Sequence, residues 1–432
     1  MRIGIVPTLD PSSGGLHQYS LTVLEALAVL SKQMKNHEFI VFANPNDEPY
    51  LRSLGGTLRR VPLRPPPLTF KERVIDLIRA RMGDCLARRM LGELLRRAWR
   101  LRRTILIRDP ERIRRRVEFA HWFGLHEVDW VFYTAPSELS FEVGLPYVMP
   151  VHDLQHRLQP EFPEVSANGE WEEREYTYRN AIRYATLILA DSEVGKEDII
   201  RFYGPYGAAP DRIKVLPHSP PSYLSLDAPK RLRVRQAYHL PERYVFYPAQ
   251  FWPHKNHARI IEALELLKRE YNAEIHVVFC GTHSGEIRER TFREVTALAH
   301  RLRLSDQVHY LGRVPDEAMS GLYAGAFALV MPTFFGPTNI PPMEAWALGC
   351  PVLCSDIRGI REQIGNAGLL VSPRSTEAIA EGIYRLWTDK HLRDQLAVRG
   401  RRRLARYTPE DFRRRLADIV CEANELVRGL NR

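Results

Sequence analysis

The residues best suited to do chemistry lie in the segment Phe334–Leu353. The apolar run before it, Ala326–Met331, predicts a buried strand. A loop with glycine, proline and asparagine follows, and a helix is predicted to begin at Pro341-Pro342 with Glu344 in its first turn. A strand, a tight loop and a helix start together present backbone N–H groups and the positive end of a helix dipole. This arrangement is typical of a phosphate-binding site.

A second candidate is Lys255, which follows the predicted strand Tyr244–Pro248 within the sequence Pro-His-Lys-Asn-His. An ammonium group is a compact point charge that suits phosphate oxygens. Taken alone, a lysine is more often an exposed surface residue. Its position in the loop after a strand favours ligand binding instead.

Two glycines, Gly14 and Gly15, follow the first predicted strand, Arg2–Pro7. Glycine lets a ligand such as a diphosphate approach the backbone closely. A pair of glycines is also a common turn signal, so this feature is weaker than Lys255.

Three potential metal ligands, His152, Asp153 and His156, lie within five residues. A mononuclear metal site needs side chains that converge on one point, and this segment directly follows a predicted strand. The sequence therefore favours no metal here. An alternative role for Asp153 is to cap the helix that follows.

Apolar runs alternate with helical patterns twice along the chain, which predicts two α/β units. In the first unit the predicted strands after Arg2–Pro7 are 39–42, 130–133, 147–151 and 185–190. A helix is predicted from about Leu16 to Leu30, and Asp191-Ser192 is predicted to cap another. In the second unit the predicted strands are 244–248, 275–280, 308–311, 326–331, 352–355 and 369–371, with a helix over 260–271.

The composition is that of a globular protein: of 432 residues, 44% are hydrophobic and 10% are aromatic. No stretch offers the ~20 apolar residues that a membrane-spanning helix needs. The N-terminus enters a strand directly, without signal-peptide features, which predicts a cytoplasmic location. The five cysteines show no paired metal spacing and are expected to be reduced.

The formal net charge of +10 favours an anionic partner. Many arginines crowd a segment at about 69–117, where an apolar stripe predicts one or two amphipathic helices. One interpretation is a solvated basic cap on the first unit. The other is adsorption on an anionic membrane surface, which would make the protein peripheral on the inner face of a membrane. Nucleic acid is disfavoured because aromatic interleaving and recognised motifs are lacking.

Several segments together resemble the retaining glycosyltransferases of the GT-B fold, most closely family 4 (glycosyl transferases group 1). These segments are Gly14-Gly15, Val151–His156, Ala190–Glu193, Tyr247–His257, Gly312–Val314 and the loop and helix that contain Glu344. The similarity covers nearly the whole chain and is strongest from Tyr244 to Val371. It leaves out the basic insertion.

The resemblance implies an α/β protein with two Rossmann-like domains that face each other across an interdomain cleft. We expect an N-terminal acceptor domain (1–218), a linker (219–240), a C-terminal nucleotide-sugar donor domain (241–407) and a C-terminal helix (408–432) that crosses back to the N-terminal domain. The residues Thr408-Pro409-Glu410 predict a capped start for this helix.

The resemblance also implies roles for single residues. Glu344 would hold the ribose hydroxyls, Lys255 the diphosphate, and His152 the reacting sugar, where it would bind a hydroxyl or stabilise the developing cation. These three are the expected catalytic residues. The expected donor-binding residues are Gly14, Gly15, Gln250, Lys255, Gly312, Arg313, Val314, Thr338, Asn339, Ile340 and Glu344.

Two positions depart from the family pattern. The family has two glutamates with seven residues between them, and the position of the first is occupied here by Gly336. In the family, the first glutamate binds hydroxyls of the transferred sugar. Thr338 or Asn339 would have to substitute for it. The family also commonly has an arginine five residues before its lysine, and here that position is Gln250. Lys255 would then be the principal phosphate cation, helped by His254 as a second one.

The implied reaction moves a hexose from a GDP-, UDP- or dTDP-sugar to a hydroxyl of a glycan or lipid-linked glycan, in bacterial surface polysaccharide assembly. The sequence lacks an Asp-x-Asp pair, so we expect neither a metal nor another cofactor. A nucleotide-sugar 2-epimerase of the same fold and a non-catalytic homologue are the alternatives.

Overall fold

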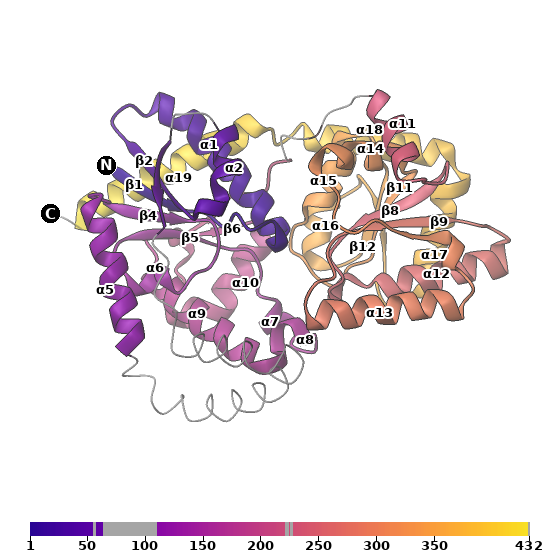
Figure 1. Ribbon diagram of the computed structural model, residues 1–432, viewed down its shortest axis with the longest axis horizontal. Helices are drawn as coiled ribbons and strands as arrows, with labels where there is room; N and C mark the ends of the chain where they lie inside the picture. Colours follow the sequence, from indigo (N-terminus) through magenta and orange to yellow (C-terminus); the bar gives the residue numbers. More distant parts are fainter. Residues whose placement is uncertain (55–57, 64–109, 221–223, 225–227, 431–432) are drawn as a thin grey trace.

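A computed structural model describes residues 1–54, 58–63, 110–220, 224 and 228–430 of the chain. The described residues form two α/β domains side by side, with the N-terminal domain at the left of Figure 1 and the C-terminal domain at the right. The basic insertion at about 69–117 lies outside the described residues as far as Asp109; from Pro110 the backbone is helical.

The first domain is built on a parallel sheet with the strand order β3-β2-β1-β4-β5-β6-β7. Its strands are β1 (Arg2–Val6), β2 (Glu38–Ala43), β3 (Arg59–Pro62), β4 (Trp130–Tyr133), β5 (Tyr147–Val151), β6 (Leu187–Ala190) and β7 (Ile213–Val215). Its helices are α1 (Gly15–Gln33), α2 (Glu48–Ser53), α5 (Pro110–Leu125), α6 (Leu139–Glu142), α7 (Gln155–Leu158), α8 (Pro163–Ser166), α9 (Glu170–Tyr184) and α10 (Glu193–Tyr203).

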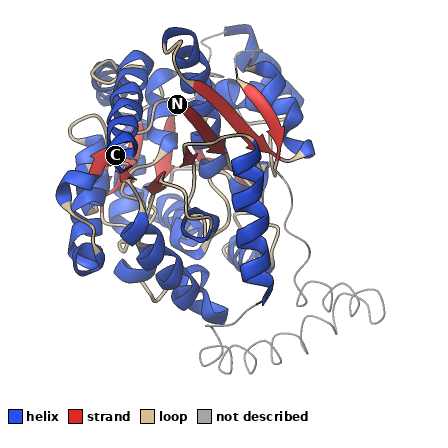
Figure 2. Ribbon diagram, turned by 90° about the vertical axis from the view of Figure 1, so that its left-hand side faces the viewer, coloured by secondary structure: helices blue, strands red, loops and turns tan. Residues whose placement is uncertain are grey.

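Both faces of this sheet are buried under helices. Successive side chains of a strand point to opposite faces, so each strand contributes to both buried layers. On β2, Phe39 and Val41 pack with α1, while Ile40 and Phe42 pack with α5, α9 and α10 on the other face. The continuous apolar runs of the sequence therefore match strands covered by helices on both sides (Figure 2).

The second domain repeats this plan with the strand order β10-β9-β8-β11-β12-β13. Its strands are β8 (Tyr244–Pro248), β9 (His276–Cys280), β10 (Val308–Tyr310), β11 (Ala328–Met331), β12 (Val352–Ser355) and β13 (Leu369–Val371). Its helices are α11 (Ala228–Ala237), α12 (His257–Tyr271), α13 (Glu286–Arg301), α14 (Asp316–Gly325), α15 (Ile340–Ala347), α16 (Arg358–Ile364), α17 (Thr376–Thr388) and α18 (Lys390–Leu404).

The predicted linker 219–240 is too long at its C-terminal end. Residues 228–237 form α11, which packs on α14, and Val234 and Leu240 are buried in the core of the second domain. The polar, arginine-rich sequence of α11 hides this role, because among its residues 233–237 Val234 alone is buried.

The C-terminal helix α19 (Pro409–Leu430) crosses back and packs on the first domain, as the resemblance implied (Figure 1). Thr408 and Asp411 form a reciprocal capping pair, because the Oγ1 of Thr408 accepts from the N–H of Asp411 and the Asp411 carboxylate accepts from the N–H of Thr408. Further along, Asn424 accepts a hydrogen bond from Trp130 of β4 at 2.8 Å. The apolar face of α19 completes the core that contains β1 and α1.

Figure 2 shows that both ends of the chain lie on the side of the first domain. Within the described residues, no helix has both the length and the apolar character that a bilayer crossing requires.

The packing of α19 makes a prediction about stability. Leu416 is fully buried against the first domain, whereas Leu426 on the same helix is 43% exposed. Leu416→Ala is expected to lower the free energy of unfolding by about 2–5 kcal/mol through lost burial and a residual cavity. Leu426→Ala is the matched control and should change it by less than about 0.5 kcal/mol. Urea unfolding curves would measure both, and equal effects would contradict the packing.

Candidate functional site

Several of the predicted site residues follow the strands at which the strand order of each sheet reverses. The order changes direction between β1 and β4 in the first domain and between β8 and β11 in the second. In an open parallel sheet, this reversal opens a crevice at the carboxyl ends of the strands. Gly14 follows β1, Lys255 follows β8, and Thr338 follows β11. The site therefore draws on both crevices.

The two crevices face each other, because loops from the two domains are hydrogen-bonded across the gap. Gln250, after β8, donates from Nε2 to the carbonyl of Ser12, after β1, at 2.9 Å. Gln159 donates to the carbonyl of Phe334, after β11, at 2.8 Å. We call the space between these loops the interdomain cleft.

Charged groups of α10 and α16 also join the domains. Arg358 contacts Glu197 and Asp198, with 2.7 Å between its Nη1 and Oδ1 of Asp198. The carboxylate of Glu362 accepts the N–H groups of Glu193 and Val194 at 3.1 and 3.0 Å. Glu362 therefore satisfies orphan donors at the start of α10 and opposes the helix dipole.

Lys255 is a half-buried cation at the floor of the cleft. Burial lowers the pKa of Lys255 to about 8, and the nearby charges of Asp153 and Glu164 oppose this change. Among the residues that the structure describes, no carboxylate lies within 4.0 Å of its Nζ atom. Because Lys255 lacks an ion pair, it can meet an anionic ligand.

His254 does not share this role, contrary to the expectation of a second phosphate cation. Its Nδ1 lies 2.5 Å from Oε1 of Glu164, a residue of the first domain. Burial and the charge of Lys255 lower the pKa of His254 to about 4, despite the opposing effect of Glu164. The histidine therefore joins the domains through Glu164 instead of adding a positive charge.

His152 lies at the end of β5, and both of its ring nitrogens face acceptors. Nδ1 lies 3.1 Å from Oδ2 of Asp191, and Nε2 lies 3.1 Å from the carbonyl of Thr134. A neutral imidazole carries one N–H, so only the imidazolium satisfies both contacts. Burial by itself lowers the pKa of His152, but Asp191 more than offsets this, and the pKa is raised above 6.5.

The charge on His152 bears on its expected role. An imidazolium repels a developing positive charge, so this arrangement does not suit stabilisation of a cationic sugar. The other expected role, binding of a sugar hydroxyl, stays a prediction.

Asp191 also contacts His218, at 3.2 Å between Oδ2 and Nε2. Burial raises the pKa of Asp191, but the charges of His218 and His152 outweigh it and hold the pKa well below its usual range. Within the described part of the chain, His152, Asp191 and His218 are the group whose geometry could hold a metal ion. The set weighed from the sequence, His152, Asp153 and His156, does not come together.

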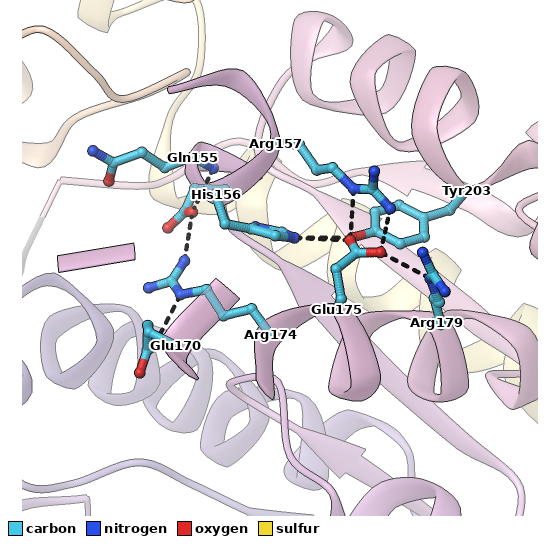
Figure 3. A network of polar contacts seen from close by, with 9 residues as sticks. Gln155, His156, Arg157, Glu170, Arg174, Glu175, Arg179 and Tyr203 are labelled. Carbon is cyan, nitrogen blue, oxygen red and sulfur yellow. Dashed lines mark hydrogen bonds and ion pairs between the residues drawn. The ribbon is translucent and has the colours of Figure 1, made fainter. Parts of the chain in front are cut away.

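Asp153 and His156 instead fix the chain after β5 to α9. Figure 3 shows His156 directed toward Glu175 of α9. Asp153 accepts from the N–H of Gln155 at 3.0 Å, which is a local cap, and pairs with Arg174 at 3.1 Å. The carboxylate of Glu175 is buried and accepts from several side chains, namely His156, Arg157, Arg179 and Tyr203. Burial raises the pKa of Glu175, but these hydrogen bonds prevail and lower it to about 2.

Glu344 is 4% exposed and accepts a hydrogen bond from Tyr323 of α14 at 2.5 Å. It lies in the second turn of α15, not in the first turn as predicted, because the helix begins at Ile340 with Asn339 as its cap residue. A carboxylate so far from the helix start gains little from the dipole. Helix stabilisation therefore does not account for this buried charge.

Gly336 and Asn339 lie against each other in the loop after β11. Gly336 has a φ of +130°, and a Cβ atom built there would lie 2.6 Å from Nδ2 of Asn339. The Asn339 amide thus lies where another side chain would begin. A larger residue at 336 would require Asn339 to move.

The predicted phosphate-binding amides are not equivalent. The N–H of Asn339 donates to Gln363 at 2.9 Å, and Gln363 donates back to its carbonyl at 2.6 Å. The hydroxyl of Thr338 is buried without a hydrogen-bond partner in the described structure. A ligand would therefore meet Thr338 and Ile340 before Asn339.

The remaining predicted residues follow β1 and β10. Gly14 has a φ of +58°, and a Cβ atom there would lie 3.0 Å from Nε2 of Gln250, whereas Gly15 faces open space. Gly312 has a φ of +67° and accepts the N–H of Gly281 at 2.9 Å. Arg313 is exposed, and the neighbouring Val314 is 9% exposed.

A cavity of about 250 Å³ lies between the domains, at the end of the cleft away from Gly14. The first domain lines it with His152, Asp153 and Leu154, and the second with Gly336 and Arg358.

Comparisons with known proteins agree with this geometry. Residues 230–403 match the family described as Glycosyl transferases group 1. The structure of HepE from Anabaena in complex with UDP and glucose superposes with a TM-score of 0.70 at 16% identity, over 98% of this chain and 99% of that one. The fold is GT-B. The glycosyltransferase WaaG of lipopolysaccharide biosynthesis gives a TM-score of 0.65 at 17% identity, over 97% of this chain and 99% of that one.

Relatives in sequence carry related names. The O-antigen chain mannosyltransferase B of Escherichia coli is 30% identical over 240 residues, 55% of this chain. That alignment spans 61% of the mannosyltransferase's own length. A D-inositol 3-phosphate glycosyltransferase of Paenarthrobacter aurescens is 24% identical over 75% of this chain and 78% of its own length.

Sequence reasoning missed Asp191 and His218 as partners of His152. Ser192 does cap α10, by accepting the N–H of Gly195 at 3.0 Å, so the predicted cap is confirmed. Asp191 reaches His152 because they directly follow β6 and β5, which are neighbours in the sheet. An expected pairing of these two strands could have placed the two residues together. His218 lies in a proline-rich segment that gave no such signal.

The ion pair of His152 predicts how stability depends on pH. A raised pKa means that the contribution of His152 is fully present below pH 6.5 and is lost as the pH rises through the raised value. The lowered pKa of Asp191 means that its contribution is present above pH 3.8 and is lost as the pH falls through the lowered value. Urea unfolding of Asp191→Asn should therefore show a smaller loss of stability between pH 6.5 and 9 than the wild type. The exposed substitution Asp211→Asn is the control, and identical pH profiles for wild type and Asp191→Asn would refute the pairing.

Proposed function

We propose that this protein is a retaining glycosyltransferase that moves a hexose from a nucleotide-diphosphate sugar to a hydroxyl of a glycan or lipid-linked glycan, in bacterial surface polysaccharide assembly. The observation that carries the proposal is Lys255. Its half-buried ammonium has no carboxylate within 4.0 Å among the described residues and lies where two strand-order reversals face each other. A diphosphate between two Rossmann-like domains supplies the missing anion.

The comparisons support the donor and the acceptor. A neighbour in fold binds UDP and glucose by its title, and relatives in sequence are named as O-antigen mannosyltransferases. A nucleotide-sugar donor and a glycan acceptor are therefore the substrates to test first.

In this proposal, the protein stabilises charge on the departing nucleoside diphosphate. As the bond between the sugar carbon and the phosphate oxygen breaks, negative charge grows on the diphosphate, and Lys255 and the amides of Thr338 and Ile340 meet it. Glu344 accepts hydrogen bonds from the ribose hydroxyls. Lysine and peptide dipoles supply this charge, so the reaction proceeds without a metal ion.

Retention follows from attack on the face that the diphosphate leaves. Gly336 offers no carboxylate to form a covalent intermediate at the sugar end of the cleft. The acceptor oxygen forms its bond to the sugar carbon as the phosphate oxygen departs, and the acceptor proton passes to that phosphate oxygen. His152 lines the cavity at this end and would hold a sugar hydroxyl.

The first test measures nucleotide binding. UDP, GDP and dTDP are added separately, and at least one is expected to raise the wild-type Tm, because a ligand that binds the folded state stabilises it. Lys255→Gln should weaken that binding about 10-fold or more, while the exposed Lys268→Gln of α12 should not. Since the pKa of Lys255 is about 8, wild-type affinity should also fall between pH 7 and 9, and Lys255→Gln should not show this fall.

The same panel separates the alternatives. If none of the nucleoside diphosphates or their sugars raises the Tm, the proposed function is wrong. If incubation with a nucleotide sugar alone yields an epimerised sugar, the protein is an epimerase.

A second test concerns Glu344. Glu344→Gln keeps an oxygen for the hydroxyl of Tyr323 but removes the charge that attracts two ribose hydroxyls. The variant is expected to bind the nucleoside diphosphate about 10-fold more weakly, with a ligand-free Tm close to that of the wild type. Isothermal titration calorimetry would measure this, with Glu317→Gln, exposed on α14, as the control. An unchanged affinity would exclude the ribose role.

A further inference from the structure

Arg288, in the first turn of α13, lies at the cleft and has no role so far. Its Nη1 donates to Oε1 of Gln250 at 2.9 Å. The guanidinium lies over the ring of Trp252, with 4.6 Å between Cζ and the ring centroid. These two contacts hold the group in a defined orientation.

Arg288 lacks an anionic partner in the described structure. No described carboxylate lies within 4.0 Å of its guanidinium, and Glu289, on the next position of α13, accepts the N–H of Gly285 instead. The Nε atom of Arg288 is buried without an acceptor. A buried donor without a partner is destabilising. A cation in the first turn of a helix is also repelled by the dipole.

The guanidinium adjoins one of the contacts between the two domains. The Gln250 side chain that binds Arg288 also donates to the carbonyl of Ser12 and lies against Gly14. The same loop continues to Lys255. An anion bound against Gly14 would therefore lie next to Arg288.

We propose that Arg288 binds the diphosphate of the donor, supplying from α13 the guanidinium that position 250 lacks. This assignment rests on the proposed function. Gln250 holds one nitrogen of Arg288, and Nε and Nη2 have no acceptor among the described residues. This edge of a guanidinium suits two phosphate oxygens.

The test compares a nucleoside diphosphate with its nucleoside. Calorimetry is run with UDP, GDP and dTDP and with uridine, guanosine and thymidine, on wild type and Arg288→Gln. The variant is expected to bind the preferred diphosphate about 10- to 100-fold more weakly, the loss of one charge-assisted contact. Binding of the nucleoside should change less than about 2-fold. Arg290→Gln removes the same charge from an exposed position on α13 and should leave both affinities unchanged.

A second variant tests whether the loss of the guanidinium causes the loss of diphosphate affinity. Adding Gln250→Arg to Arg288→Gln is expected to restore at least about 10-fold of the lost diphosphate affinity, because a guanidinium returns to the same place. Ligand-free Tm values show that each variant is folded.

The outcomes separate this proposal from the proposed function. If the wild type binds the diphosphate and Arg288→Gln binds it equally well, Arg288 has no phosphate role and the proposed function stands. If diphosphate and nucleoside weaken equally, Arg288 is structural. If the wild type binds no nucleotide, the proposed function fails, and this assignment with it.

Discussion

The reversal of strand order in each sheet is the constraint on which the rest of the structure depends. In each sheet, later strands lie on both sides of the first one, β1 or β8, so the strand order reverses beside that strand. A crevice opens at the carboxyl ends of the strands where the order reverses. Turning these two crevices toward each other brings Gly14 and Lys255 into one cleft, although 240 residues separate them in sequence. Neither domain alone contains a complete site.

Electrostatics in the cleft is divided between paired and unpaired charges. Carboxylates are consistently matched: Asp153 with Arg174, Glu164 with His254, and Asp191 with two histidines. Lys255 and Arg288 are cations without a described carboxylate within 4.0 Å, and the exposed Arg313 likewise has none. Where the carboxylates have cationic partners and some cations have no carboxylate partner, the local charge is positive. Such a site attracts an anion without rearrangement of the protein.

Much of this could be predicted from the sequence, because buried parallel strands are continuous apolar runs. Strands β4, β5 and β8 begin and end at the predicted residues. The edge strands β3 and β7 were missed, since three or four residues with mixed polarity carry little signal. Lys255 and Glu344 stood out through their local context. His218 and Arg288 did not, because their partners are brought to them by packing between distant segments.

The return of α19 to the first domain also governs how the domains can move. The chain passes between them twice, once after the first domain ends near Leu216 and once before α19 begins at Pro409. Two tethers leave less freedom than one, and relative motion reduces to a hinge rotation about the line that joins the crossings. The polar contacts of Arg358 and Glu362 lie on the rim that such a rotation would separate. The rates of substrate entry and product release would then depend on how easily these rim contacts break. The residues that make the contacts are distant from the reacting atoms.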